Sequence, residues 1–251
     1  MARIYLTGRM AIEGPQGLVD ETELPGVQGR VALAFLVLAR GPVSRDALAE
    51  AVWEGKDLPA GWDKALNPII SKLRAAFSRA GIDGKDALAS GTGAIELRRH
   101  DEIGVDFERC VTAVDAAEGA LRQADVSTAW ANAAVASSIA RRPFLAGVYG
   151  DWVVNKRQLL GELQYRSLEV LVDVWIERRD LRQAAGLADA MVSLDRLRER
   201  GYRRLIEVNG LAGDSAAAQR VFVRCQSALA ELGVTPSEQT ESALLKAGGR
   251  H

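Results

Sequence analysis

A repeat with a period of 34 residues in the second half of the chain limits how that half can fold. Apolar residues there follow helical spacing, and no alternating strand pattern is present after Asp106. The aligned pairs are Leu171 with Leu205, Val172 with Ile206, Asp180 with Asp214, Ala184 with Ala218, Leu187 with Val221, Ala188 with Phe222, and Met191 with Cys225. A repeat of this length holds one pair of helices, which is unable to bury its apolar face alone. We therefore expect the pairs to stack as a short helical solenoid.

The period and the small residue shared by Ala184 and Ala218 are typical of tetratricopeptide (TPR) helix pairs. Upstream of the repeat, residues 105–121 and 128–142 also show helical spacing, and residues 143–150 (PFLAGVYG) predict a loop. We expect residues 105–251 to form an all-helical, TPR-like domain.

The first 104 residues combine strands with helices. Short apolar runs between Arg3 and Gly26 are broken by glycine and proline and predict a small antiparallel sheet. An almost wholly apolar helix is expected from Val27 to Arg40. The next helix should begin at Ser44, whose hydroxyl can accept a hydrogen bond from an unpaired amide of the first turn.

The third predicted helix carries an apolar stripe and a polar outer surface. Leu66, Ile70, Leu73 and Phe77 share one face and must pack on a core. The polar side chains on its other faces are Lys64, Asn67, Ser71, Lys72, Arg74 and Arg79. Pro68 lacks a backbone donor, so the sequence predicts either a helix that starts near Leu66 or Asn67, or a kink.

Residues 88–97 read as two short strands around a glycine turn. The order of sheet, three helices and hairpin is that of a winged helix-turn-helix, in which the third helix is offered to the major groove of DNA. The predicted fold is thus mainly α, with a winged helix and small β-sheets in residues 1–104 and the helical domain in residues 105–251.

Composition excludes several other classes of protein. The 251 residues are 48% hydrophobic and 26% charged, with a net charge of −1, so bulk charge does not attract nucleic acid and any DNA-binding surface must be local. The N-terminus has no signal-peptide pattern and the longest apolar run is too short to cross a bilayer, so we expect a cytoplasmic protein without membrane contact. Two distant cysteines and two histidines offer neither a metal site nor a pair of nucleophile and base. We therefore expect no metal, no cofactor and no enzymatic activity.

Residues 25–105 resemble the OmpR-type winged helix of the SARP and AfsR/EmbR-like bacterial activators. The likeness rests on VSRDALAEAVW, on Ala65-Leu66, and on the helical segment Ile70-Ser71-Lys72-Leu73-Arg74. The resemblance implies contacts with double-stranded DNA from Lys64, Asn67, Ser71, Lys72 and Arg74, and from Arg98 and Arg99 at the wing. It also implies that the loop containing Lys56, Asp57 and Leu58 touches RNA polymerase.

The helical half resembles the bacterial transcriptional activator domain of the same activators. The segments that carry this likeness are Phe144-Leu145-Ala146-Gly147-Val148 with Trp152, ERRDLRQAAGLA, LDRLRERGYRRLI and LAELGVTPSEQTESALLKA. Membership would imply a homodimer or tandem assembly on direct repeats beside a promoter.

The sequence departs from the family pattern at three places, which leaves a second hypothesis open. Pro68 and Ile69 replace polar or aromatic residues usual at the exposed start of the third helix, and Glu96 lies in a wing that usually carries aromatic and basic residues. The alternative is therefore a TPR-like module that binds a protein or small-molecule effector, with DNA binding weakened or lost.

A cluster of arginines bears on the same alternative. Its members are Arg196, Arg198, Arg200, Arg203 and Arg204. The cluster either holds an anion, a nucleotide effector or a partner's acidic helix, or it is a solvated face beside a turn.

Overall fold

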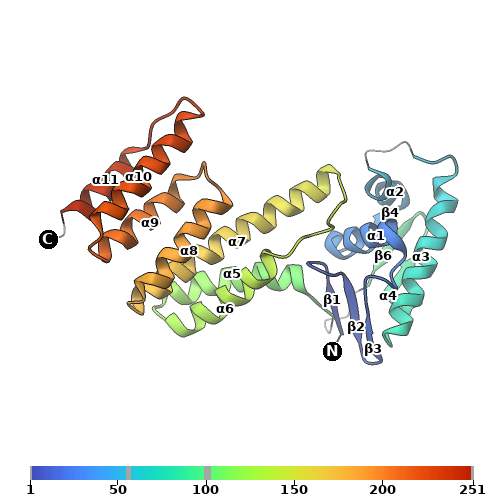
Figure 1. Cartoon of the computed structure of the whole chain (residues 1–251). Coiled ribbons are helices and arrows are strands. Elements are labelled where there is room, and N and C mark those ends of the chain that lie inside the picture. Colours follow the sequence, from blue (N-terminus) through green and yellow to red (C-terminus); the bar gives the residue numbers. More distant parts are fainter. Residues whose placement is uncertain (1, 55–57, 99–102, 250–251) are drawn as a thin grey trace. The chain divides into compact units, whose positions relative to one another are not determined.

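A computed structural model describes residues 2–54, 58–98 and 103–249 (Figure 1). These residues divide into two compact units. The first unit contains the residues up to 109 together with 139–160, and the second contains 110–138 and the residues from 161 onward. Each unit is described by itself below.

The first unit starts with a four-stranded sheet of order β3-β2-β1-β7. The strands are β1 (Ala2–Tyr5), β2 (Ala11–Gly14), β3 (Gly17–Val19) and β7 (Ile103–Val105). Strands β1 to β3 pair antiparallel, as predicted, whereas β7 pairs parallel with β1, which the sequence analysis missed. Asp106 secures this junction: its buried carboxylate accepts hydrogen bonds from the backbone N–H groups of Leu6 and Thr7 and from the Thr7 hydroxyl, at 2.6–3.0 Å.

Three long helices, one short helical turn and a second sheet complete the winged helix (Figure 1). The helices are α1 (Gly26–Ala39), α2 (Arg45–Trp53), α3 (Trp62–Arg79) and the single turn α4 (Gly84–Ala87). The second sheet has the order β4-β6-β5, with β4 (Val43–Ser44), β5 (Leu88–Ser90) and β6 (Ala94–Leu97). The predicted hairpin is β5 and β6, and the predicted cap is present because the Ser44 hydroxyl accepts from the backbone N–H of Ala47.

The core of the winged helix lies between α1, α2 and α3, which contact one another pairwise. Its largest fully buried side chains include Leu33, Leu36, Leu48, Leu66, Leu73 and Phe77. The apolar stripe predicted for the third helix therefore packs where expected, and it fixes which face of α3 remains outside.

The rest of the chain is helical over its described residues. The helices are α5 (Asp106–Arg122), α6 (Val126–Ala140), α7 (Asp151–Glu177), α8 (Leu181–Leu194), α9 (Glu199–Leu211), α10 (Ser215–Ala230) and α11 (Glu238–Gly248). The expected loop at 143–150 separates α6 from α7. The fold class predicted from the sequence is confirmed: a mainly α chain with small N-terminal sheets and a TPR-like helical part.

The 34-residue repeat is visible in the backbone as well as in the sequence. Asp180 caps α8 by accepting from the N–H of Gln183, and Asp214 caps α10 by accepting from the N–H of Ala217. Both capping residues have φ −94° and ψ 77°. Ala184 and Ala218, at the small-residue position, are fully buried in the same apolar cluster. The two helix pairs therefore repeat the same local geometry, and α9 packs against both α8 and α10.

Candidate nucleic-acid interface

Helix α3 begins at Trp62, and this corrects the interpretation of Pro68. A start near Leu66 or Asn67 would have placed the proline in the first turn, whereas it is the seventh residue of the helix. Proline has no N–H to donate to the carbonyl of Lys64, four residues earlier. The carbonyl and the proline ring both belong to the solvent side of the helix, because Lys64 and Pro68 are exposed. Water can therefore satisfy the unpaired acceptor.

The outer face of α3 holds most of the residues predicted to contact DNA. Lys64, Asn67, Ser71 and Lys72 are all exposed and recur at spacings that place them on one side of a helix. Neither lysine forms an ion pair with any residue that the structure describes. Their ammonium groups are available to phosphate. Ile69 is an exception to the expected exposure, since its side chain is buried and belongs to the core.

Asn67 is held by an arginine that the sequence analysis did not identify. The guanidinium of Arg45, at the start of α2, donates to Asn67 Oδ1 at 2.8 Å and to the backbone carbonyl of Asp63 at 2.6 Å. It also forms an ion pair with the Asp63 carboxylate. A planar guanidinium that bridges two helices orients the amide before any ligand arrives. Asp63, whose side chain is 59% exposed, adds a negative charge beside this face.

Arg74 faces the wing rather than solvent alone. Its guanidinium donates to the carbonyl of Leu88 from Nε at 2.9 Å and from Nη2 at 2.6 Å, and Nη2 also reaches the Ser90 hydroxyl at 2.7 Å. These bonds connect α3 to β5. Arg74 therefore fixes the position of the wing, and a direct contact of this residue with DNA stays a prediction.

The wing carries its own balance of charge. Arg98 is 56% exposed and lies 3.7 Å from Glu96 and 3.8 Å from Asp86. Ion pairs this long and exposed contribute about 1 kcal/mol at most, so Arg98 can exchange them for a phosphate. The turn at Gly91 to Ala94 closes through an N–H to carbonyl bond of 2.9 Å, and its largest side chain is that of Thr92. A turn of this size has no long side chain to insert into a minor groove.

Three of the predicted contact residues, Lys56, Asp57 and Arg99, lie outside the described residues. Leu58, the remaining residue of the predicted polymerase loop, is 44% exposed. Across residues 2–54, 58–98 and 103–249 there is no cluster of metal-ligating side chains. No helix within these ranges is long and apolar enough to span a membrane.

Comparisons with known proteins identify the family of the chain. The model of the bacterial transcriptional activator domain matches residues 105–245. The transcriptional regulatory protein MoaR1 of Mycobacterium bovis is 30% identical over 219 residues, which cover 83% of this chain and 68% of MoaR1. MoaR1 of Mycobacterium tuberculosis is 31% identical over 226 residues, with the same coverage.

A solved structure supports the fold. Mycobacterium tuberculosis EmbR, in complex with a low-affinity phosphopeptide, superposes with a TM-score of 0.84 at 22% identity. The match covers 98% of this chain and 64% of the EmbR chain, so EmbR extends well beyond the matched region. The chain belongs to the SARP and AfsR/EmbR-like bacterial transcriptional activators, because residues 105–245 match the bacterial transcriptional activator domain and MoaR1 is 30% identical over 219 residues.

Proposed function

We propose that this protein is a sequence-specific, DNA-binding transcription activator that inserts the outer face of α3 into the major groove. The observation that carries the proposal is the set of exposed side chains on that face, with Lys64 and Lys72 on either side of an Asn67 amide fixed by Arg45. Lysines without carboxylate partners bind phosphate, and an oriented asparagine amide can recognise an adenine edge.

The roles of the remaining parts follow from the family. We assign DNA binding to residues 1–104 and assembly to residues 105–251. In this proposal two copies, as a dimer or in tandem, occupy direct repeats near a promoter, and the loop at residues 56–58 contacts RNA polymerase. Such a protein acts in the cytoplasm and performs no catalysis.

The proposal predicts salt-dependent binding with a lysine requirement. The purified chain would be titrated against genomic fragments that cover its own upstream region, at several salt concentrations. Lys72→Ala should weaken binding to all bound fragments and reduce the slope of log affinity against log salt by about 1, since one phosphate contact is lost. Lys156→Ala instead removes a lysine of α7 that forms no ion pair with the described residues, and it should leave the slope unchanged.

A second function is favoured by the negative charge of Asp63 beside the outer face and by the short wing turn. In that case the helical domain holds a protein or small-molecule partner, and DNA binding is weak. If no fragment binds specifically at any salt concentration, or if Lys72→Ala and Lys156→Ala behave alike, the major-groove proposal is wrong and this second function is preferred.

A further inference from the structure

We propose that a cavity bounded by α7, α9 and α11 binds a small dianionic molecule of the phosphate-ester or diphosphate class. The cavity lies wholly in the second unit and has a volume of about 420 Å³. Volumes of about 300–1,000 Å³ are usual for small-molecule sites. This proposal concerns a site separate from the outer face of α3 and does not depend on DNA binding.

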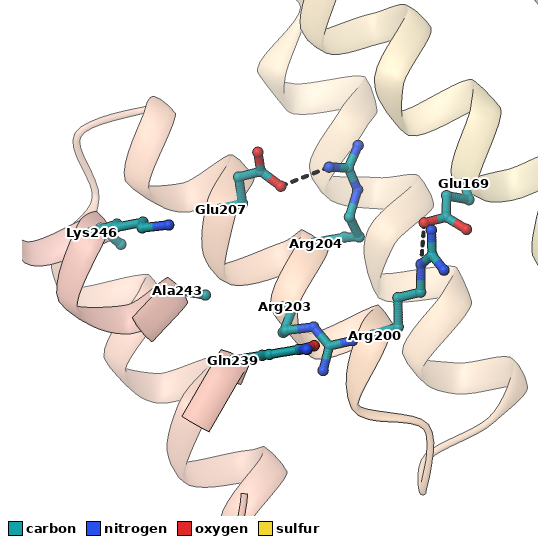
Figure 2. A pocket seen from close by; sticks show the side chains of 9 residues that line it. Glu169, Arg200, Arg203, Arg204, Glu207, Gln239, Ala243 and Lys246 are labelled. Carbon is teal, nitrogen blue, oxygen red and sulfur yellow. Dashed lines mark hydrogen bonds and ion pairs between the residues drawn. The ribbon is translucent and has the colours of Figure 1, made fainter. Parts of the chain in front are cut away.

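Four cations from two helices line the cavity. Arg200, Arg203 and Arg204 lie at i, i+3 and i+4 on α9, a spacing that gives them one helix face. Lys246 comes from α11. Figure 2 shows the side chains of Lys246 and Gln239 extending from α11 toward α9.

The cations outnumber the carboxylates of the cavity. Glu169 and Glu207 line it and pair with Arg200 and Arg204, respectively, the latter at 2.7 Å (Figure 2). Arg203 and Lys246 form no ion pair within the described part of the chain. Four positive and two negative side chains line the cavity, and Asp173, just outside the lining, also pairs with Arg204, so the net formal charge of the cluster is +1. An anionic ligand would be attracted by this charge, and Arg203 and Lys246 are the two cations open to it.

A buried donor also lacks an acceptor in this cluster. Arg204 is 17% exposed, and its terminal nitrogens bind Asp173 and Glu207, but its Nε is buried without a hydrogen-bond partner among the described residues. An unsatisfied donor on a charged group is costly when it is buried. Because this atom has almost no accessible surface, a ligand oxygen would reach it only if the Arg204 side chain turned toward the cavity.

The surroundings of Arg203 explain why that residue is available. Among the described residues, its side chain forms a long hydrogen bond of 3.4 Å to the Thr240 hydroxyl. That hydroxyl donates to Glu199, which also accepts from the backbone N–H and hydroxyl of Ser237 at 2.9 and 2.8 Å. Glu199 is thus hydrogen-bonded by the start of α11. Arg203 interacts with Glu199 through charge alone and has no hydrogen-bonded carboxylate among the described residues.

The arginines of this cluster are therefore not simply a solvated face beside a turn. Arg196 and Arg198, outside the cavity, bind Glu231 and Glu162 at 2.7 and 2.6 Å. These two connect the segment between α8 and α9 to the end of α10 and to α7, whereas Arg203 and Lys246 have no such partner among the described residues. The concave shape, with Ala243 and Ala247 on the α11 side, suits a small molecule better than the convex surface of an acidic helix.

Calorimetric titration of the full chain with inorganic pyrophosphate tests the site. We expect saturable binding with a Kd of about 1 mM or tighter. Loss of one charge-assisted hydrogen bond corresponds to about tenfold in affinity, so Lys246→Ala and Arg203→Gln should each weaken binding by about that factor. Arg182→Gln removes an exposed arginine of α8 outside the cavity and should bind as the wild type does.

Glu207→Gln tests the site in a way that misfolding cannot imitate. It should tighten binding several-fold, because it removes a carboxylate that competes with the ligand for the cations. The proposal is overturned if the wild type gives no saturable heat at millimolar pyrophosphate, or if Lys246→Ala and Arg203→Gln bind as tightly as Arg182→Gln. It is also overturned if an acidic peptide binds the chain in the same titration while pyrophosphate does not. DNA affinity, measured separately with Lys72→Ala, reports on the other proposal alone.

Discussion

Glu54 Oε1 accepts a hydrogen bond of 2.6 Å from the backbone N–H of Asp151. Glu54 is the C-cap residue that follows α2, and Asp151 is the first residue of α7. A side chain of the winged helix therefore caps a helix that starts 97 residues later. An unpaired amide and the positive end of the helix dipole both favour a carboxylate at this position. A Cβ on Gly150 would lie 2.1 Å from Glu54 Oε2, so only glycine leaves room for this arrangement.

Replacement of Glu54 by alanine should lower the free energy of unfolding by about 1–2 kcal/mol, because the first turn of α7 loses its cap. Urea denaturation followed by tryptophan fluorescence would measure the change. Glu50→Ala, one turn earlier on the exposed side of α2, should change stability by less than about 0.5 kcal/mol. Equal effects of the two substitutions would show that the hydrogen bond to Asp151 contributes nothing.

Arg74 and Lys72 are expected to differ in what they do. Arg74→Ala should destabilise the first unit by about 1–3 kcal/mol, because the Leu88 carbonyl loses a charged donor and the wing loses its link to α3. Lys72→Ala should leave unfolding unchanged while it weakens DNA binding. Denaturation and DNA titration of both variants would test this. A stable Arg74→Ala variant would contradict the structural role assigned to the guanidinium.

Alanine substitutions at two glycines of the helical part should change the stability of the protein in opposite directions. A Cβ on Gly210 of α9 would lie 2.7 Å from the Cβ of Ala247 and 2.8 Å from its Cα, so Gly210→Ala must push α11 away and destabilise the second unit. Gly186 of α8 has nothing within 4 Å of such a Cβ, and Gly186→Ala should stabilise by up to about 1 kcal/mol through helix propensity. Thermal unfolding of both variants gives the comparison. Gly210→Ala should also reduce pyrophosphate binding, since Lys246 moves with α11.

Asp125 makes stability depend on pH in the acid range. Hydrogen bonds from the hydroxyl and backbone N–H of Thr128, and from the Ser127 hydroxyl, lower the pKa of Asp125 to about 2. A lowered pKa means that the stabilisation is complete above the pKa of the unfolded chain, about 4, and is lost as pH falls toward about 2. The stability difference between wild type and Asp125→Asn should therefore shrink over that interval. A carboxyl NMR titration that gives an ordinary pKa would contradict this.

Short-range patterns predicted much of this fold. The spacing of Leu66, Ile70, Leu73 and Phe77 placed the inner face of α3 correctly, because 3.6 residues per turn fix which side chains share a face. The cap at Ser44 is likewise local chemistry. The repeat aligned Asp180 with Asp214, although it did not predict that both residues cap helices. Such features depend on residues within a few positions of one another, so the sequence reports them directly.

The errors came from contacts between distant segments. Nothing in the three residues of β7 identifies β1 as its partner. The spacing of α3 located Asn67 and Arg74 on the helix, but their hydrogen bonds to Arg45 and to the wing depend on how α2 and β5 pack. Of the two interpretations of Pro68, the start of the helix near Leu66 or Asn67 was wrong, because α3 begins at Trp62. Proline is tolerated inside this helix because the carbonyl that it leaves unpaired is exposed and can bind water. Arg45 belongs to no repeating pattern in the sequence, so nothing marked it as a partner of Asn67.

The parallel pairing of β1 with β7 has a consequence for synthesis of the protein. Ala2 pairs with Ile103 and Ile4 with Val105, and the backbone of Leu6 and Thr7 requires the carboxylate of Asp106. Contacts between residues about 100 positions apart form late, since a long loop must close before they give any stabilisation. During translation the first strand therefore leaves the ribosome long before its partner exists. The winged helix should reach its folded form only after the start of α5 has also emerged, so the proposed DNA-binding surface matures together with the beginning of the activator domain.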